Sequence, residues 1–308
     1  MRQYLLRRFL TSLLVLFGVS VFTFLMLHLV PGDPVHALAG RMISSPEKID
    51  ELRREMGLDK PLPVQYFDYV NKIFHGDFGK SLKNKRDVLE SILEQFPATF
   101  QLTCSALLLS TVFGLLLGAL AAFNHDTWID HVLSGFAVCG ISLPPFFVGL
   151  MLILILSIRL NLLPATAKTS DPISLVLPSI TLAIGESAWL ARLVRSAILN
   201  ELQESYQWTA RSKGVSERSV LWKHILRNAL IPIITAVGLQ FVYLMAGSVL
   251  VESLFARQGI GRLALIAIQN RDFPLVQGTV TFISVIYVVI NTVTDILYAV
   301  VDPRVRLQ

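Results

Sequence analysis

Long apolar stretches alternate with short polar segments along this chain. A helix needs about 20 apolar residues to cross the hydrocarbon core of a bilayer. Six stretches approach or exceed that length: Phe9–Val30, Thr99–Phe123, Val132–Ile158, Leu175–Leu193, Ala229–Leu250 and Val280–Val300. Because a helix satisfies its own backbone hydrogen bonds in lipid, the pattern predicts an all-α protein with six transmembrane helices.

Two of these stretches contain helix breakers. Pro144 and Pro145 fall within the third stretch, and Pro178 and Gly185 fall within the fourth, so we expect both to be interrupted. Lipid tolerates such breaks where neighbouring helices or a water-filled path satisfy the freed backbone groups. Pro144 and Pro145 are therefore candidates for lining a translocation path, and a simple packing kink is the alternative.

The composition agrees with a membrane protein. The 308 residues are 53% hydrophobic and 16% charged, whereas soluble domains carry about 25% charged residues. Lys and Arg are concentrated in the N-terminal tail, in the C-terminal tail and between the fourth and fifth stretches. Since such residues mark cytoplasmic segments, we expect both termini in the cytoplasm. The net charge of +5 reflects this asymmetry, and no nucleic-acid partner is indicated.

The segment after the first stretch has a helical pattern of its own and nearly balanced charge. Helices are expected from Ser45 to Met56, over Gln65–Phe74 and over Asp87–Gln95, with Ser45 as the first N-cap. We interpret this segment as an extracytoplasmic helical cap. The predicted divisions are an N-terminal tail with the first helix (1–30), the cap (31–96), a five-helix core (97–302) and a cytoplasmic tail (303–308).

A polar, basic island, Glu204–His224, separates the fourth and fifth apolar stretches. A helix is expected over Glu201–Lys213, with Gly214 suited to end it and Ser216 suited to cap a second helix. Val220, Leu221, His224 and Ile225 would then share one face. The residues leave two interpretations open: a hairpin that enters a partner's groove, or one that lies on lipid headgroups.

Motifs for catalysis are absent from the sequence. There is no phosphate-binding G-x-x-x-x-G-K-[ST], no G-x-S-x-G and no H-E-x-x-H, the six histidines are scattered, and Cys104 and Cys139 lie in apolar stretches. We expect no enzymatic activity, no cofactor and no metal in this chain. Ionisable groups at membrane depth, namely Glu186, Glu252 and Asp295, are costly in lipid. Glu186 is a candidate for the translocation path, with structural pairing as the alternative.

Several motifs in order resemble one family. Thr209-Ala210-Arg-Ser-Lys-Gly214, followed by His224-Ile-Leu-Arg-Asn-Ala-Leu-Ile-Pro232, is similar to the cytoplasmic EAA loop of ABC-transporter permeases. The variant resembles the branch that imports dipeptides, oligopeptides and nickel. Trp208-Thr209-Ala210 stands where the general pattern has Glu-Ala-Ala. The other matching motifs are Pro31–Pro34, Met56–Pro61, Gly76–Gly79 with Ser81, Val251–Phe255, Gly259–Arg262, Arg271–Pro274 and Asp302–Arg304.

The resemblance implies a type I ABC-importer-like permease fold in a bacterial plasma (inner) membrane. The chain would form half of a translocation path for di- or oligopeptides, with nickel or a metal chelate as the alternative cargo. The implied partners are a second homologous permease, two cytoplasmic ATP-binding subunits that hold ATP and Mg, and an extracytoplasmic substrate-binding protein. A coupling loop at about 196–228 would contact the ATPases through Glu204, Tyr206, Ala210, Arg211, Lys213 and Gly214.

Two other classes compete with this interpretation. A secondary transporter would need intramembrane ionisable groups and commonly an inverted repeat, and the sequence shows few of the former and none of the latter. A membrane scaffold without transport would have little use for broken helices and the polar island.

Overall fold

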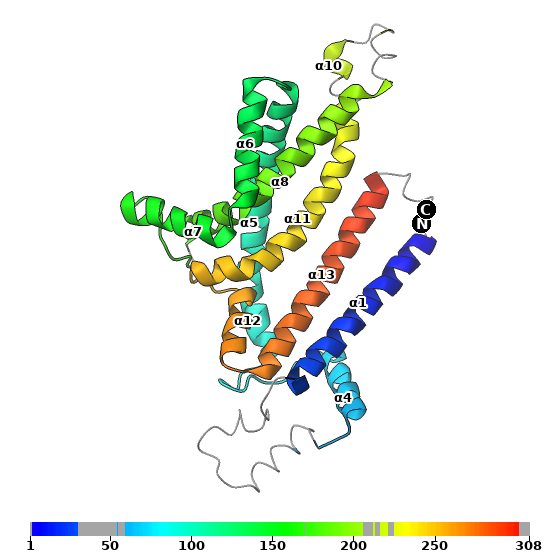
Figure 1. Ribbon diagram of the computed structural model, residues 1–308. Helices are drawn as coiled ribbons and strands as arrows, with labels where there is room; N and C mark the ends of the chain where they lie inside the picture. The colour runs from blue at the N-terminus through cyan, green and yellow to red at the C-terminus, as the bar shows by residue number, and fades with distance from the viewer. Residues whose placement is uncertain are drawn as a thin grey trace. The chain divides into compact units, whose positions relative to one another are not determined.

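The computed structural model describes residues 2–29, 54, 59–169, 171–205, 212, 216–220 and 225–301. Within these ranges the chain is helical, and strand-like pairing is confined to an isolated bridge between Lys80 and Asp87. The predicted all-α class is therefore confirmed. Figure 1 labels the helices, which are α1 (Arg2–Leu29), α4 (Leu62–Phe74), α5 (Val88–Phe123), α6 (Trp128–Ser142), α7 (Pro145–Leu152), α8 (Val176–Gln203), α10 (Glu217–Val220), α11 (Leu226–Leu254), α12 (Ile260–Gln269) and α13 (Phe273–Val301).

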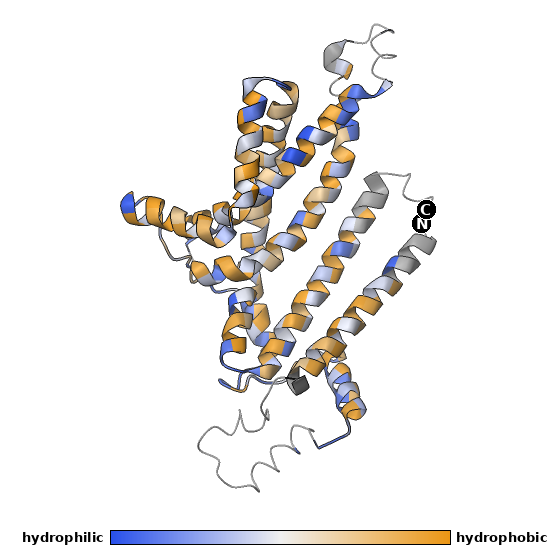
Figure 2. Ribbon diagram, in the orientation of Figure 1, coloured by the Kyte–Doolittle hydropathy of each residue, from blue (hydrophilic) through white to orange (hydrophobic). Residues whose placement is uncertain are grey.

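Four helical segments are long and apolar enough to cross a membrane: Val88–Phe123, Pro172–Gln203, Leu226–Leu254 and Phe273–Thr294. Their apolar character is visible along α5, α8, α11 and α13 in Figure 2. They correspond to the second, fourth, fifth and sixth predicted stretches. The first stretch yields a shorter apolar helix, Leu10–Met26, within α1. The third is a bent pair, so the described residues give four or five spans rather than six.

The third stretch breaks where the prolines predict. Helix α6 ends at Ser142, and its direction differs by 102° from that of the following helical segment, Pro145–Arg159. Pro144 has an extended backbone, with φ −61° and ψ 137°, and Pro145 occupies the first position of α7. That position suits proline because a first-turn N–H has no partner within the helix.

The predicted interruption of the fourth stretch is wrong, because α8 runs unbroken from Val176 to Gln203. Pro178 is the third residue of α8, where the backbone N–H has no partner within an α-helix, so the ring costs no such hydrogen bond. Gly185 instead marks a close helix crossing. A Cβ there would lie 3.7 Å from the carbonyl oxygen of Gly140 in α6.

The cap is described in part. Helix α4 confirms the expected helix over Gln65–Phe74, and the one expected from Ser45 to Met56 lies almost wholly outside the described residues. The helix expected over Asp87–Gln95 is present from Val88, but its predicted end at Gln95 is wrong, because α5 continues through Pro97 into the second span.

The chain forms two compact units. The first comprises Met1–Pro97 and Arg262–Val289. In it, Tyr66 and Tyr69 of α4 pack against Phe24 of α1, with ring centroids 5.4 and 5.9 Å away, and the Tyr66 hydroxyl lies 2.8 Å from Ser20 Oγ. The helical part of the cap is therefore joined to the first helix by aromatic and hydroxyl contacts.

The second unit comprises Ala98–Gly261 and Ile290–Gln308, and holds α6, α7, α8, α10 and α11. Its helices approach closely at glycines. A Cβ on Gly118 of α5 would lie 2.5 Å from the carbonyl oxygen of Ala191 in α8, and one on Gly114 would lie 2.8 Å from Leu190. Membrane helices commonly pack through small residues spaced four apart, because there the two backbones can touch.

Candidate coupling and translocation sites

The centre of the predicted coupling loop, with Tyr206, Ala210, Arg211, Lys213 and Gly214, lies outside the described residues. Glu204 is described. It follows the last residue of α8, is exposed, and has an extended backbone with φ −66° and ψ 139°. A helix continuous from Glu201 to Lys213 is therefore wrong, since α8 ends at Gln203.

The flanks of the loop are anchored in the second unit. Helix α10 begins directly after Ser216, as the capping pattern predicts. Val220 is 0% exposed and Ile225 is 2% exposed, so these two members of the predicted common face are buried in this chain. Leu221 and His224, the other two members, lie outside the described residues. Val220 and Ile225 belong to one apolar core with residues of α5, α8 and α11: Ala122, Leu190, Val194, Ala197, Ile198, Ala229, Ile233 and Ala236. The described start of the second half of the loop is thus packed into the helix bundle.

The candidates for the translocation path flank one helix crossing. A Cβ on Gly140 of α6 would lie 2.8 Å from the Cβ of Ala188 in α8, so the two helices nearly touch there. Pro144 follows Gly140 by about one helical turn and is exposed, and Glu186 precedes Ala188 and is half-buried. The structure therefore brings the neighbourhoods of Glu186 and the Pro144-Pro145 break together.

Helix α11 adds a polar side chain beside Glu186. The side-chain amide nitrogen of Gln240 donates to the backbone carbonyl of Glu186 at 2.7 Å. Gln240 is 1% exposed, and its Oε1 has no hydrogen-bond partner among the described residues. A buried amide oxygen without a partner is costly. This part of the α8–α11 contact is therefore polar, as a hydrophilic path would require.

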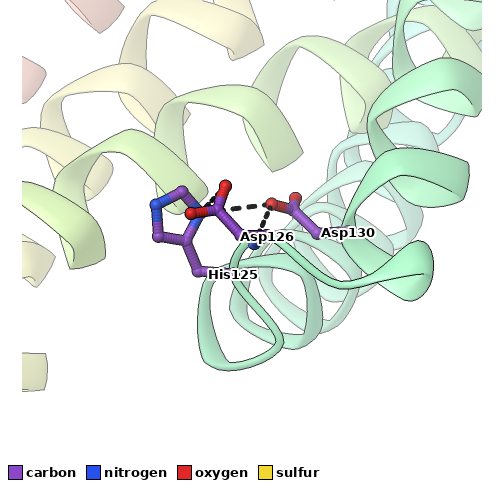
Figure 3. Close-up of side chains that lie close together, drawn as sticks. All are labelled: His125, Asp126 and Asp130. Atoms are coloured by element: carbon purple, nitrogen blue, oxygen red, sulfur yellow. Dashed lines mark hydrogen bonds and ion pairs between the residues drawn. The ribbon is translucent and has the colours of Figure 1, made fainter.

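A second polar cluster joins the α5–α6 loop to α8. Both oxygens of Asp130, in the first turn of α6, accept hydrogen bonds from Arg195 of α8, at 2.6 Å from Nε and 2.7 Å from Nη2. Asp130 also accepts from the backbone N–H of Asp126 at 3.2 Å. His125 Nδ1 lies 3.3 Å from Asp130 Oδ2 and 3.3 Å from Arg195 Nη2. Figure 3 shows His125, Asp126 and Asp130 turned toward one another.

These three side chains could also offer metal ligands, since their ligand atoms lie within 4.8 Å of one another. The guanidinium of Arg195, however, already engages both carboxylate oxygens of Asp130. Paired hydrogen bonds of this kind are the strong form of the arginine–carboxylate interaction. The cluster is therefore best described as an ion-pair network.

A third cluster surrounds Glu252 near the end of α11. Glu252 is 0% exposed, and its Oε1 accepts from Thr99 Oγ1 at 2.6 Å. Thr99 Oγ1 in turn accepts from the backbone N–H of Ile260 at 2.9 Å. Gly259 and Gly261 pack against the Glu252 carboxylate, where any side chain would collide with it. The Val251–Phe255 and Gly259–Arg262 motifs are thus linked, because the glycines of the second make room for the carboxylate of the first.

Arg257 lies in the loop that follows α11 and is 1% exposed. It donates to Gln101 Oε1 at 2.9 Å and, at 3.3 Å, to the carbonyl oxygen of Ala98. Burial lowers the pKa of the Arg257 guanidinium from its usual value, and the negative charge of Glu252 opposes that shift.

Two further motifs meet in the first unit. Ser81 Oγ donates to Asp272 Oδ2 at 2.5 Å, and the backbone N–H of Leu82 donates to Asp272 Oδ1 at 3.1 Å. Gly76 and Gly79 before Ser81 have φ of 76° and 77°, a conformation that glycine adopts without strain. The Gly76–Ser81 and Arg271–Pro274 motifs are therefore two halves of one tertiary contact.

Sequence reasoning missed the pairing of Asp130 with Arg195 and of Thr99 with Glu252. Asp130 and Arg195 are 65 residues apart in the sequence, and Thr99 and Glu252 are 153 residues apart. At such separations the spacing along the chain does not indicate which residues pair. The available clue was the presence of a charged residue at the edge of an apolar stretch, which requires a partner when it is buried.

Comparisons with known proteins agree with this architecture. The family described as binding-protein-dependent transport system inner membrane component matches residues 114–307, and its N-terminal membrane component family matches residues 1–103. The glutathione transport system permease protein GsiC of Escherichia coli strain K12 is 39% identical over 308 residues, and that of Salmonella typhi is 40% identical; both alignments cover 100% of each chain.

Solved structures share the fold. An inward-facing structure of the MetNI methionine ABC transporter has a TM-score of 0.56 at 16% identity, covering 68% of this chain and 96% of that one. A crystal structure of an amino acid ABC transporter with histidines has a TM-score of 0.54 at 22% identity, covering 70% and 94%. At such identities the likeness concerns the fold.

Proposed function

We propose, because this chain belongs to the family of binding-protein-dependent transport system inner membrane components, that it forms half of the path through an importer of glutathione or similar short peptides. As a permease of an ABC importer, it is a multi-pass inner-membrane protein that works with ATPases and a substrate-binding protein. The second half of the path would come from a homologous permease, and ATP and Mg would be held by two cytoplasmic ATPases.

The observation that carries the coupling role is the burial of Val220 and Ile225 beside α8 and α11. A loop anchored in this way would transmit a push from an ATPase to both helices as a rigid-body movement. This proposal places the loop and both termini in the cytoplasm, in agreement with the distribution of Lys and Arg. Ala210 and Gly214 are the small residues through which the loop would enter a groove of the ATPase.

Ala210→Glu should abolish co-purification of the ATPases while the permease still inserts into the membrane. A bulky charge at the small position would fill the space that the groove needs and would bury an unpaired carboxylate. Affinity purification of the tagged permease from membranes measures the result. The matched control is Asn71→Glu, which adds the same charge to an exposed position of α4. Normal recovery of the ATPases with Ala210→Glu would contradict the docking role.

The substrate proposal rests on the GsiC relatives, whose name assigns them to glutathione transport. The test uses the permease pair, the ATPases and the substrate-binding protein reconstituted in proteoliposomes. We expect ATP-dependent uptake of radiolabelled glutathione, with competition by unlabelled dipeptides and none by Ni²⁺. Uptake of ⁶³Ni²⁺ without any peptide uptake would instead support the nickel alternative.

Glu186→Gln should slow this uptake by about tenfold or more if the Glu186 carboxylate faces the path, because a hydrogen bond to a charged group is worth about 1.5–3 kcal/mol. The initial rate at saturating substrate is the measurement. Glu90→Gln makes the same change at an exposed position of α5 and should leave the rate unaltered. Equal rates for Glu186→Gln and the unsubstituted protein would assign Glu186 to structural pairing with its neighbours.

A further inference from the structure

Helix α6 is attached to α8 at two points that lie ten residues apart along α6. One is the close contact of Gly140 with Ala188. The other is the ion pair of Asp130 with Arg195. At about 1.5 Å per residue, these points are about 15 Å apart along the helix axis. Two separated attachments prevent a helix from rotating about either one alone.

Between the two points, α5, α6 and α8 line an open groove of about 290 Å³, whose walls include Ser134, Ala137, Ser187 and Ala191. Side chains of α6 and α8 therefore pack incompletely over the intervening turns. The Asp130–Arg195 ion pair therefore holds the first turn of α6 against α8. Asp130 is 3% exposed, so water competes little for its oxygens.

Both ends of this arrangement connect to functional elements. Arg195 lies about two turns before the end of α8 at Gln203, directly before the polar island Glu204–His224. Val194, next to Arg195, belongs to the same apolar core as Val220 and Ile225 of the loop's second flank. At its other end, α6 leads directly into the break at Pro144. The Asp130–Arg195 ion pair thus lies between the loop and the broken span.

We propose that the Asp130–Arg195 pair is a positioning clasp that makes α6 move as one body with α8, so that displacement of the coupling loop reaches the Pro144-Pro145 break. His125 and the N–H of Asp126 hold the Asp130 carboxylate in the orientation that Arg195 requires. This inference rests on the proposed docking of ATPases to the loop and adds the element that relays their movement to α6.

The test measures the distance between α6 and α8 in the assembled transporter. Spin labels replace Phe136 of α6 and Trp189 of α8, which are 71% and 40% exposed, after Cys104 and Cys139 have been changed to Ser. Pulsed electron resonance is recorded without nucleotide and after trapping with ATP and vanadate. We expect one narrow distance that is the same in both states for the unsubstituted pair, and a broadened or shifted distance after trapping for Asp130→Asn.

Two further variants keep the test informative if Asp130→Asn fails to assemble. Arg195→Lys retains the charge but loses the paired geometry, so it should broaden the distance to an intermediate extent. Arg192→Gln is the control, because it removes a guanidinium one turn earlier on α8. The Arg192 guanidinium has no hydrogen-bond or ion-pair partner among the described residues, so this variant should retain the narrow distance. An unchanged distance in Asp130→Asn or Arg195→Lys would overturn the proposal, as would a distance that changes in the unsubstituted protein.

A functional measurement distinguishes transmission of movement from α8 to α6 from a purely stabilising role of the ion pair. Asp130→Asn should lower glutathione uptake per ATP hydrolysed by about tenfold while ATP hydrolysis stays within about twofold. The exposed substitution Asp68→Asn should leave this ratio unchanged. Proportional loss of uptake and hydrolysis would contradict the relay. Failure of the ATPases to co-purify with the unsubstituted permease would overturn the proposed function itself, a result distinct from either of these.

Discussion

Gly118→Ala should destabilise the folded permease by about 1–3 kcal/mol, the usual cost of overpacking. A Cβ at position 118 would lie 2.5 Å from the carbonyl oxygen of Ala191 and 2.7 Å from the Cβ of Val194. The obstacle includes the backbone of α8, so a side-chain rotation cannot relieve it, and α5 must separate from α8. The midpoint of thermal unfolding of the detergent-solubilised permease, followed by circular dichroism, measures the effect.

Gly135→Ala is the matched control, because a Cβ at Gly135 of α6 would meet nothing within 4 Å. In an unobstructed helix, alanine is favoured over glycine by about 0.5–1 kcal/mol, so this variant should be slightly more stable. The same chemical change is thus expected to have opposite signs at two positions. Equal effects of the two substitutions would contradict the close α5–α8 packing.

Glu252→Ala should cost about 1–3 kcal/mol, the range found when a buried hydrogen-bonding group is left without its partner. The substitution leaves the hydroxyl of Thr99 without its acceptor and the buried Arg257 without the nearby negative charge. It also removes the surface against which Gly259 and Gly261 pack. The amount of folded permease in membranes and the unfolding midpoint of the purified protein are the measurements.

Glu252→Gln retains the shape and an oxygen acceptor, so it should recover part of the lost stability. Asp68→Ala serves as the control for losing a carboxylate, since Asp68 pairs with Lys60 at 2.6 Å but both side chains are about half exposed. Exposed pairs contribute little because water and salt screen them. A midpoint for Glu252→Ala equal to that of Asp68→Ala would show that the Glu252 cluster is unimportant for stability.

The glycine and carboxylate clusters explain why the family motifs occur where they do. Gly259 and Gly261 accommodate the carboxylate of Glu252, and Ser81 meets Asp272 across 191 residues of sequence. Each motif therefore contains one partner of a tertiary contact, and the other partner can be far away in the sequence. The resemblance identified the family through these motifs without indicating which of them touch.

The sequence by itself determined the helical class, the family, the break at Pro144 and the common face of Val220 and Ile225. Those features depend on local chemistry: apolar length, the missing N–H of proline, and helical periodicity. It misjudged Pro178, whose effect depends on its place in the helix, and it separated a cap helix from α5. Only the tertiary structure decided that Asp130 meets Arg195, that Thr99 meets Glu252 and that Gly118 meets Ala191. Such pairs depend on how helices cross, and charge, size and spacing along one chain do not specify a crossing.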